Sequence, residues 1–206
     1  MGFLLDLLSL LIQYYVQLIA IMNPFSALPT FVSLTERLGP GEKDIIVKKA
    51  SWAMLAIMLS FTFLGNVILE AFSISIASLR IGGGIILMVL AVDMLGEMPR
   101  TKRVEARDMA VVPIATPLIV GPGTLTTILL LTSTERTLLN TAVLIIAEVA
   151  AVLTTMLTLR FSGGLVRLLR VSTVRALGRF MSIIIASVAV DMIAKGIYAY
   201  IVRFYM

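Results

Sequence analysis

The sequence has no cysteine and no histidine among its 206 residues. Without cysteine it can form no disulfide and has no thiol chemistry, so the sequence does not indicate whether its compartment is oxidising or reducing. Without histidine it lacks the commonest general base, the commonest zinc ligand and the usual partner of a serine nucleophile. Charged residues make up only 14%, whereas soluble domains have about a quarter. We therefore expect neither an enzyme nor a metal or cofactor site.

Apolar residues are abundant, at 59% of the chain, and the mean hydropathy is +1.04. This composition is typical of an integral membrane protein. A membrane-spanning helix needs about 20 apolar residues, so the chain has room for about six spans and short loops. The first apolar segment carries Asp6 and has no basic leader or small-residue cleavage pattern, which predicts a retained span. We expect an all-α membrane protein without a folded soluble domain.

Six apolar segments alternate with charged or Gly/Pro-rich loops, and cover about residues 3–34, 45–72, 75–96, 109–132, 138–159 and 177–201. Of the 17 Lys and Arg residues, 13 fall in the three loop regions on one side and 4 on the other. Cytoplasmic loops carry such an excess of basic residues. This predicts a plasma-membrane protein with both termini outside. The positive charge belongs to membrane-flanking loops, so the expected partner is the lipid bilayer and not nucleic acid.

An internal repeat appears when the sequence is compared with itself at an offset of 98 residues. Pro24 then matches Pro122, and "AVDM" at 91–94 matches "AVDM" at 189–192, among 14 identities over 71 positions. Each half has three spans, an odd number, so the halves are predicted to lie inverted in the membrane, as in many secondary transporters. The predicted units are residues 1–97, a cytoplasmic basic linker at 98–108, and residues 109–206.

Prolines interrupt the first span of each half, at "IMNPFSALPTF" and "VPIATPLIVGPGTLTT". Proline cannot donate a backbone hydrogen bond, and it disfavours helical angles in the residue before it. A broken helix within a bilayer is tolerated where it is buried in protein or lines a wet cavity. Its exposed amides favour a carboxylate and its carbonyls favour an ammonium group, which suits a zwitterion. The predicted substrate-binding residues are Asn23, Pro24, Ser26, Pro29, Thr30, Thr116, Gly121, Pro122, Gly123, Thr124, Thr126 and Thr127.

The segments "NPFSALPTFVSLT" and "AVVPIATPLIVGPGTLTT" together resemble the MarC/SnatA family of six-span membrane proteins, and the resemblance covers essentially the whole chain. It implies two inverted three-helix repeats and, from characterised relatives, transport of small neutral amino acids such as glycine and alanine. The family's motifs fall on Asn23, Pro24 and Pro29, and on Pro113, Pro117, Gly121, Pro122 and Gly123. Ser26 stands where the motif usually has glycine, which leaves the pocket size open.

Three acids in apolar segments are candidates for coupling transport to a proton or sodium gradient: Glu148, Asp93 and Asp191. Glu148 is the only acid between Arg136 and Arg160, and its alternative role is a structural pair with a basic side chain. Asp191 has Lys195 four residues on, so a local ion pair is its alternative. Inversion places the two aspartates about 24 Å apart, too far for an aspartyl-protease dyad sharing one proton.

The leading hypothesis is a secondary transporter for glycine, alanine and serine, coupled to an ion gradient. The alternatives are an exporter or facilitator of another small polar solute, and a membrane scaffold or channel. A scaffold would not need paired polar helix breaks, and a channel would show a continuous polar stripe. The run "RIGGGII" at 80–86 has no Lys-Ser/Thr of a phosphate loop and predicts close helix packing. The oligomeric state is left open.

Overall fold

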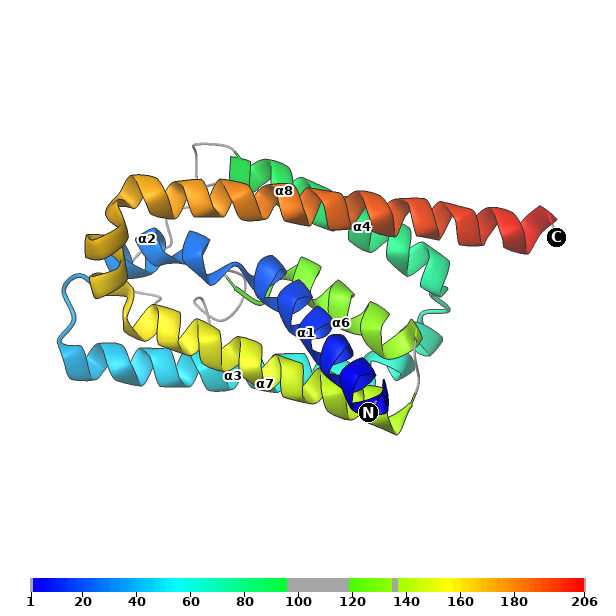
Figure 1. Cartoon of the computed structure of the whole chain (residues 1–206), viewed down its shortest axis with the longest axis horizontal. Helices are drawn as coiled ribbons and strands as arrows, with labels where there is room; N and C mark the ends of the chain where they lie inside the picture. The colour runs from blue at the N-terminus through cyan, green and yellow to red at the C-terminus, as the bar shows by residue number, and fades with distance from the viewer. Residues whose placement is uncertain (1, 96–118, 135–136, 206) are drawn as a thin grey trace.

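The chain is helical in a computed structural model that describes residues 2–95, 119–134 and 137–205 (Figure 1). In chain order the helices are α1 (Gly2–Met22), α2 (Pro24–Leu34), α3 (Pro40–Ala71), α4 (Ile76–Leu95), α6 (Pro122–Thr134), α7 (Leu138–Arg160) and α8 (Ser162–Tyr205). No strand occurs in these ranges, so the predicted all-α class is confirmed for them. The predicted linker 98–108 and residues 109–118 of the predicted fourth span lie outside them.

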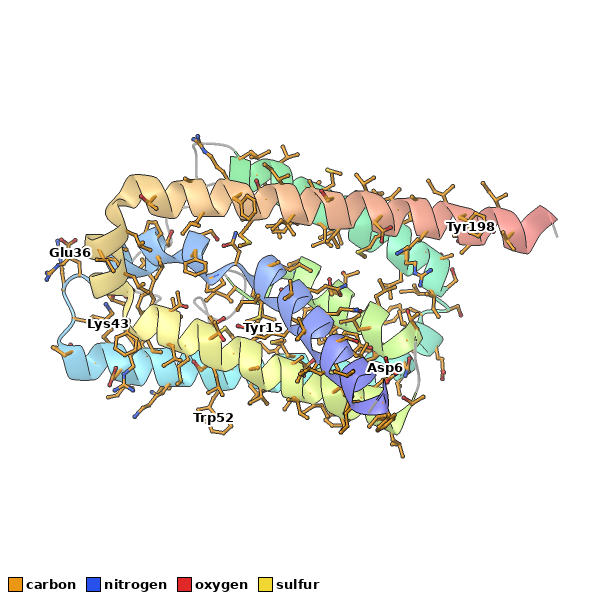
Figure 2. All side chains as sticks on the ribbon, in the orientation of Figure 1. Asp6, Tyr15, Glu36, Lys43, Trp52 and Tyr198 are labelled. Carbon is orange, nitrogen blue, oxygen red and sulfur yellow. The ribbon has the colours of Figure 1, made fainter. Side chains whose placement is uncertain are left out.

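Five helices within the described ranges are long and apolar enough to cross a membrane: α1, α3, α4, α7 and the Ala176–Val202 part of α8. Large apolar side chains cover the outside of the bundle. Trp52 is 73% exposed and points away from α3 (Figure 2), and Phe3 and Phe63 are also exposed. An apolar exterior this extensive suits lipid and not water. The molecule is an integral membrane protein.

The helices form two groups that meet in the middle of the bundle. Helices α4 and α8 lie side by side along one edge (Figure 1), where Leu87 and Ala189 belong to one buried cluster. Helices α1, α3 and α7 enclose a second cluster that includes Leu18, Met54 and Leu144. Helix α6 packs against both α3 and α4, and α2 packs against both α7 and α8. The start of α6 and the α1–α2 break therefore lie where the two groups meet.

Glycines bring α4 and α8 together. A Cβ atom added at Gly84 would lie 2.8 Å from the backbone oxygen of Ala189 and 2.6 Å from Ile193 Cγ1. At Gly196 of α8, an added Cβ would lie 3.0 Å from the backbone oxygen of Ala77. Small residues let helix backbones approach closely inside membranes. The close packing predicted for the "RIGGGII" run is confirmed.

Replacing Gly84 with alanine is expected to destabilise the protein. The new methyl group meets backbone as well as side-chain atoms, and overpacking of this kind costs about 1–3 kcal/mol. Gly82, in the same run, has open space around its Cβ position and serves as the matched control. Thermal unfolding in detergent should show a lower midpoint for Gly84→Ala and an unchanged or higher one for Gly82→Ala, since alanine favours helix. Equal midpoints for the two variants would contradict the packing.

Two helix boundaries differ from expectation. Helix α8 begins at Ser162, whereas residues 160–176 were expected to be a loop. The segment has no proline and contains four arginines and three leucines, which favour helix, so Gly163 and Gly164 alone do not end it. Pro29 was expected to interrupt the chain a second time, but it lies inside α2. Proline inside a membrane helix is tolerated where surrounding groups satisfy the freed carbonyl.

Candidate functional site

Asn23 separates α1 from α2. Its backbone is left-handed, with φ 38° and ψ 65°, a conformation in which asparagine is enriched. Its N–H donates to the Ile19 carbonyl oxygen (3.0 Å), and its Oδ1 accepts from the backbone N–H of Ser26 (3.3 Å). Ser26 Oγ also donates to the Asn23 carbonyl oxygen (2.9 Å). Pro24 is then the first residue of α2, where its missing N–H costs nothing. The Asn-Pro pair therefore ends one helix and starts the next.

This geometry predicts different stabilities for two substitutions of Asn23. Asn23→Ala keeps the left-handed backbone without asparagine's local hydrogen bond, and we expect a loss of about 1–3 kcal/mol from strain and the lost cap. Asn23→Gly relieves the strain and should cost only a few tenths of a kcal/mol. Thermal unfolding in detergent compares the two. Equal destabilisation would show that the backbone conformation at residue 23 is not left-handed in the folded protein.

Helix α6 begins at Pro122, 98 residues after the proline that begins α2. The next residue, Gly123, lies close to neighbouring helices: a Cβ there would be 2.7 Å from Leu87 Cδ2 and 3.5 Å from Ile21 Cγ2. The hydroxyls of Thr126 and Thr127 donate to the carbonyl oxygens four residues earlier, at 2.8 and 2.9 Å. Those two hydroxyls thus serve the helix's own backbone.

A cavity of about 130 Å³ lies between the two helix starts. It is bounded by the end of α1, the start of α2, the start of α6 and one face of α4. The lining residues are Ile21, Met22, Asn23, Ser26, Ile86, Leu90, Met94, Ile119, Gly121, Pro122, Gly123 and Thr124. It is therefore apolar on the α4 side and bounded by interrupted backbone on the other.

The helix ends give the cavity an ordered electrostatic character. Helices α2 and α6 begin there, and the N-terminus of a helix carries partial positive charge. Pro24 and Pro122 bring no N–H of their own, and the Ser26 N–H is bonded to Asn23 Oδ1. Helix α1 ends there, and its last carbonyls carry partial negative charge. No lysine, arginine, aspartate or glutamate lines the cavity among the described residues. The arrangement offers backbone partners to both ends of a small zwitterion.

A wider hollow of about 670 Å³ lies between α4 and α8, beside Arg80, Lys195 and Tyr198. Figure 2 shows Tyr198 near the C-terminal end of α8, far from the helix breaks. The walls of this hollow are mostly apolar, and the hollow is open to the surroundings. The smaller cavity is the better candidate because it is more enclosed and combines both interrupted segments.

The predicted site residues divide into three sets. Those that line the cavity are Asn23, Ser26, Gly121, Pro122, Gly123 and Thr124. Those in the described helices that are not among its lining residues are Pro24, Pro29, Thr30, Thr126 and Thr127. Thr116 lies outside the described residues, as do Pro113 and Pro117.

Sequence reasoning missed the wall that α4 contributes. Ile86, Leu90 and Met94 recur every four residues and so share one helix face. The Nδ2 group of Asn23 lies 3.9 Å from Met94 Sδ, within reach of a weak hydrogen bond. The four-residue spacing is visible in the sequence, but nothing there indicates that this face meets the Asn-Pro break.

Glu148 of α7 is fully buried. Its Oε1 accepts a hydrogen bond from Thr62 Oγ1 of α3 at 2.5 Å, while Oε2 has no hydrogen-bond partner in the described part of the chain. No basic side chain pairs with it there, so the structural ion pair considered from sequence is not found. Glu148 does not line the cavity. A coupling role would therefore act through helix packing and not through direct contact with a ligand.

The two aspartates of the repeated "AVDM" segments differ in their surroundings. Asp191 Oδ2 lies 2.7 Å from Lys195 Nζ, and both side chains are exposed. The local ion pair considered for Asp191 is therefore present. Asp93 is partly buried on α4, one residue before the cavity-lining Met94. Neither aspartate lines the cavity.

Comparisons with known proteins show the family of the chain. The family described as MarC family integral membrane protein matches residues 8–201. A UPF0056 membrane protein of Methanocaldococcus jannaschii is 32% identical over 198 residues, covering 90% of this chain and 97% of that protein. The UPF0056 membrane protein YvbG of Bacillus subtilis is 29% identical over 201 residues, covering 92% and 94%. No solved structure matches. The chain belongs to the MarC family of integral membrane proteins.

Proposed function

We propose that the protein is a secondary transporter of small neutral amino acids, glycine and alanine with serine at the upper limit, driven by an ion gradient. The observation that carries this proposal is the cavity between the two proline-started helices. It combines two helix N-termini with one helix C-terminus, and a neutral amino acid carries a carboxylate and an ammonium group to match. The resemblance of the two proline motifs to transporters of such amino acids supports the same substrate class.

The size of the cavity favours the smallest amino acids. A cavity of about 150 Å³ in another protein takes benzene, which has six heavy atoms. The cavity here is about 130 Å³. Glycine has five heavy atoms and alanine six, so both fit, and serine is close to the limit. Leucine, with nine, would not fit without movement of the α4 wall.

The proposed architecture has six spans in two inverted repeats, residues 1–97 and 109–206, with the site between them. Pro24 and Pro122 begin helices at repeat-related positions, which supports equivalent roles for α2 and α6. Inverted repeats that meet at broken helices allow alternating access when one repeat rocks against the other. The substrate would then be exposed to each side of the membrane in turn.

We expect both termini to face the outside of the plasma membrane. Figure 1 shows the two termini toward the same end of the bundle, away from the α2–α3 and α7–α8 connections. Reporter fusions after Arg103 and at the C-terminus should report opposite sides, with Arg103 cytoplasmic because the basic loops face inward. Two cytoplasmic reporters would exclude the proposed orientation.

Uptake of labelled glycine by liposomes containing the purified protein tests the function. We expect accumulation above equilibrium with an imposed proton or sodium gradient, and only equilibration without one. Equilibration under every condition would indicate a facilitator. No protein-dependent movement of glycine, alanine or serine would reject the amino-acid substrate and favour another solute or a scaffold.

A further inference from the structure

A line of buried polar atoms runs along α7, apart from the cavity. Glu148 Oε2, Thr155 Oγ1 and Ser162 Oγ are buried and have no hydrogen-bond partner in the described ranges. All three residues are 0% exposed. They are spaced by seven, nearly two helical turns, so Glu148 and Thr155 share one face of α7 with a rise of about 10.5 Å between them. Ser162 is the first residue of α8 and follows the last residue of α7, Arg160, by two positions.

Such a line needs an explanation, because most buried polar side-chain atoms in proteins have a partner. Leaving one unpaired costs about 1–3 kcal/mol. The fold does not require polar residues there: at the offset of 98 residues, the first half has Ala50, Ile57 and Leu64. The three polar groups are therefore specific to the second half, which is what a function carried by one half would produce.

The surroundings of Glu148 suit a proton. From α3, Thr62 donates to Glu148 at one end of the line, and Asp44 pairs with Arg160 (3.0 Å) at the other. On α1, the Tyr15 hydroxyl forms a hydrogen bond with the Thr154 hydroxyl (3.0 Å). Tyr14 is buried and has an interaction partner elsewhere. Among the side chains that the structure describes, no other Asp, Glu, Lys or Arg is buried, and α2 and α6 contain no charged residue.

An unpaired carboxylate is strongly disfavoured in such a place, and binding a proton removes the charge. A hard metal cation is a poorer fit, because it gathers about six oxygen ligands, whereas Thr62 Oγ1 is the one hydrogen-bond partner that the described part of the chain gives the carboxyl.

We propose that Glu148 exchanges a proton with the end of the bundle that bears Asp44 and Arg160, through water molecules joined by Thr155 and Ser162. This proposal rests on the proposed function, because the proton that Glu148 exchanges is then the ion whose gradient drives transport. Glu148 releases the proton from Oε2 to a water, the carboxylate keeps the Thr62 hydrogen bond, and one proton reaches bulk water by successive hops. A hydroxyl both donates and accepts, so it can join such a file. About three waters at 2.7–2.8 Å spacing would be needed to span the rise of about 10.5 Å between Glu148 and Thr155.

Stopped-flow infrared spectroscopy of the purified protein after a pH jump tests this without any substrate. The wild type should show the carbonyl band of a protonated carboxylic acid, and Glu148→Gln should remove it. A positioned proton-transfer group typically raises a rate by a factor of 10²–10⁴. Because water can take over part of that contribution, Thr155→Val and Ser162→Ala should each slow the infrared change by about tenfold or more. Thr158→Val is the matched control, because that hydroxyl already donates to the Thr154 carbonyl oxygen.

Variants that keep the hydroxyl but change the methyl group distinguish a proton route from an effect of packing. Thr155→Ser and Ser162→Thr should keep close to the wild-type rate, whereas a purely structural role would leave the rate unchanged in all four variants. Unchanged rates in Thr155→Val and Ser162→Ala would overturn the route, as would a carboxylic-acid signal that survives in Glu148→Gln. A missing glycine uptake with a normal infrared response would instead reject the proposed substrate and leave the proton route intact.

Discussion

Liposomes containing Glu148→Gln are expected to lose gradient-driven accumulation of glycine while still exchanging internal for external glycine. Glutamine has the size of glutamate, and its Oε1 can still accept the hydrogen bond from Thr62. It can neither release nor take up a proton at neutral pH. Packing around residue 148 is therefore kept and only the titratable group is lost. Accumulation ratios and exchange rates, measured on the same preparation, separate coupling from binding.

Asp191→Asn is the matched control for this prediction. It also replaces an acid by its amide in the second half, but Asp191 is exposed and paired with Lys195. We expect it to accumulate glycine as the wild type does. If Glu148→Gln also accumulates glycine normally, then Glu148 is structural. If Asp191→Asn loses accumulation instead, coupling depends on the other acid.

Gly123→Val is expected to weaken glycine binding and slow glycine uptake. The position lies at the start of α6, and its side chain would point toward Ile21, Leu87 and Leu90. Ile21 and Leu90 line the cavity, so the valine methyl groups would compete with a ligand for that space. If overpacking destabilises the glycine-bound protein by about 1–3 kcal/mol, the affinity for glycine falls by about 5- to 150-fold. Equilibrium binding of labelled glycine measures it.

The same substitution also strains packing, because the new Cβ would lie 2.7 Å from Leu87 Cδ2. Monodisperse size exclusion must therefore show that the variant folds. A second variant, Gly123→Ala with Leu87→Ala, supplies the room that the added carbon needs and should recover binding. Wild-type binding by folded Gly123→Val protein would place the substrate elsewhere.

The sequence predicts the helix breaks well, because proline chemistry is local. Pro24 and Pro122 each begin a helix for the same reason, the absence of an N–H that the first turn does not use. The burial of Glu148 also follows from its isolation in an apolar segment. Pro29 was misjudged, because whether an interior proline ends a helix depends on neighbours that satisfy the freed carbonyl.

The cavity walls were only partly predictable. In a membrane protein the lipid-facing and core-facing sides of a helix are equally apolar, so hydropathy does not show which side of α4 faces the bundle. Ile86, Leu90 and Met94 were missed for that reason. The hydroxyls of Thr126 and Thr127 were assigned to substrate, but in a helix such groups can bond their own backbone. The sequence alone does not show whether such a hydroxyl bonds a substrate or the backbone of its own helix.

We propose that a small neutral amino acid binds between the two proline-started helices. Counterflow in liposomes preloaded with unlabelled glycine tests it most directly, because exchange needs no gradient and so does not depend on the coupling ion. We expect rapid entry of labelled glycine and alanine, slower entry of serine, none of leucine, and much slower entry of glycine in folded Gly123→Val protein. Entry of leucine as fast as glycine, or glycine entry that Gly123→Val leaves unchanged, would contradict it.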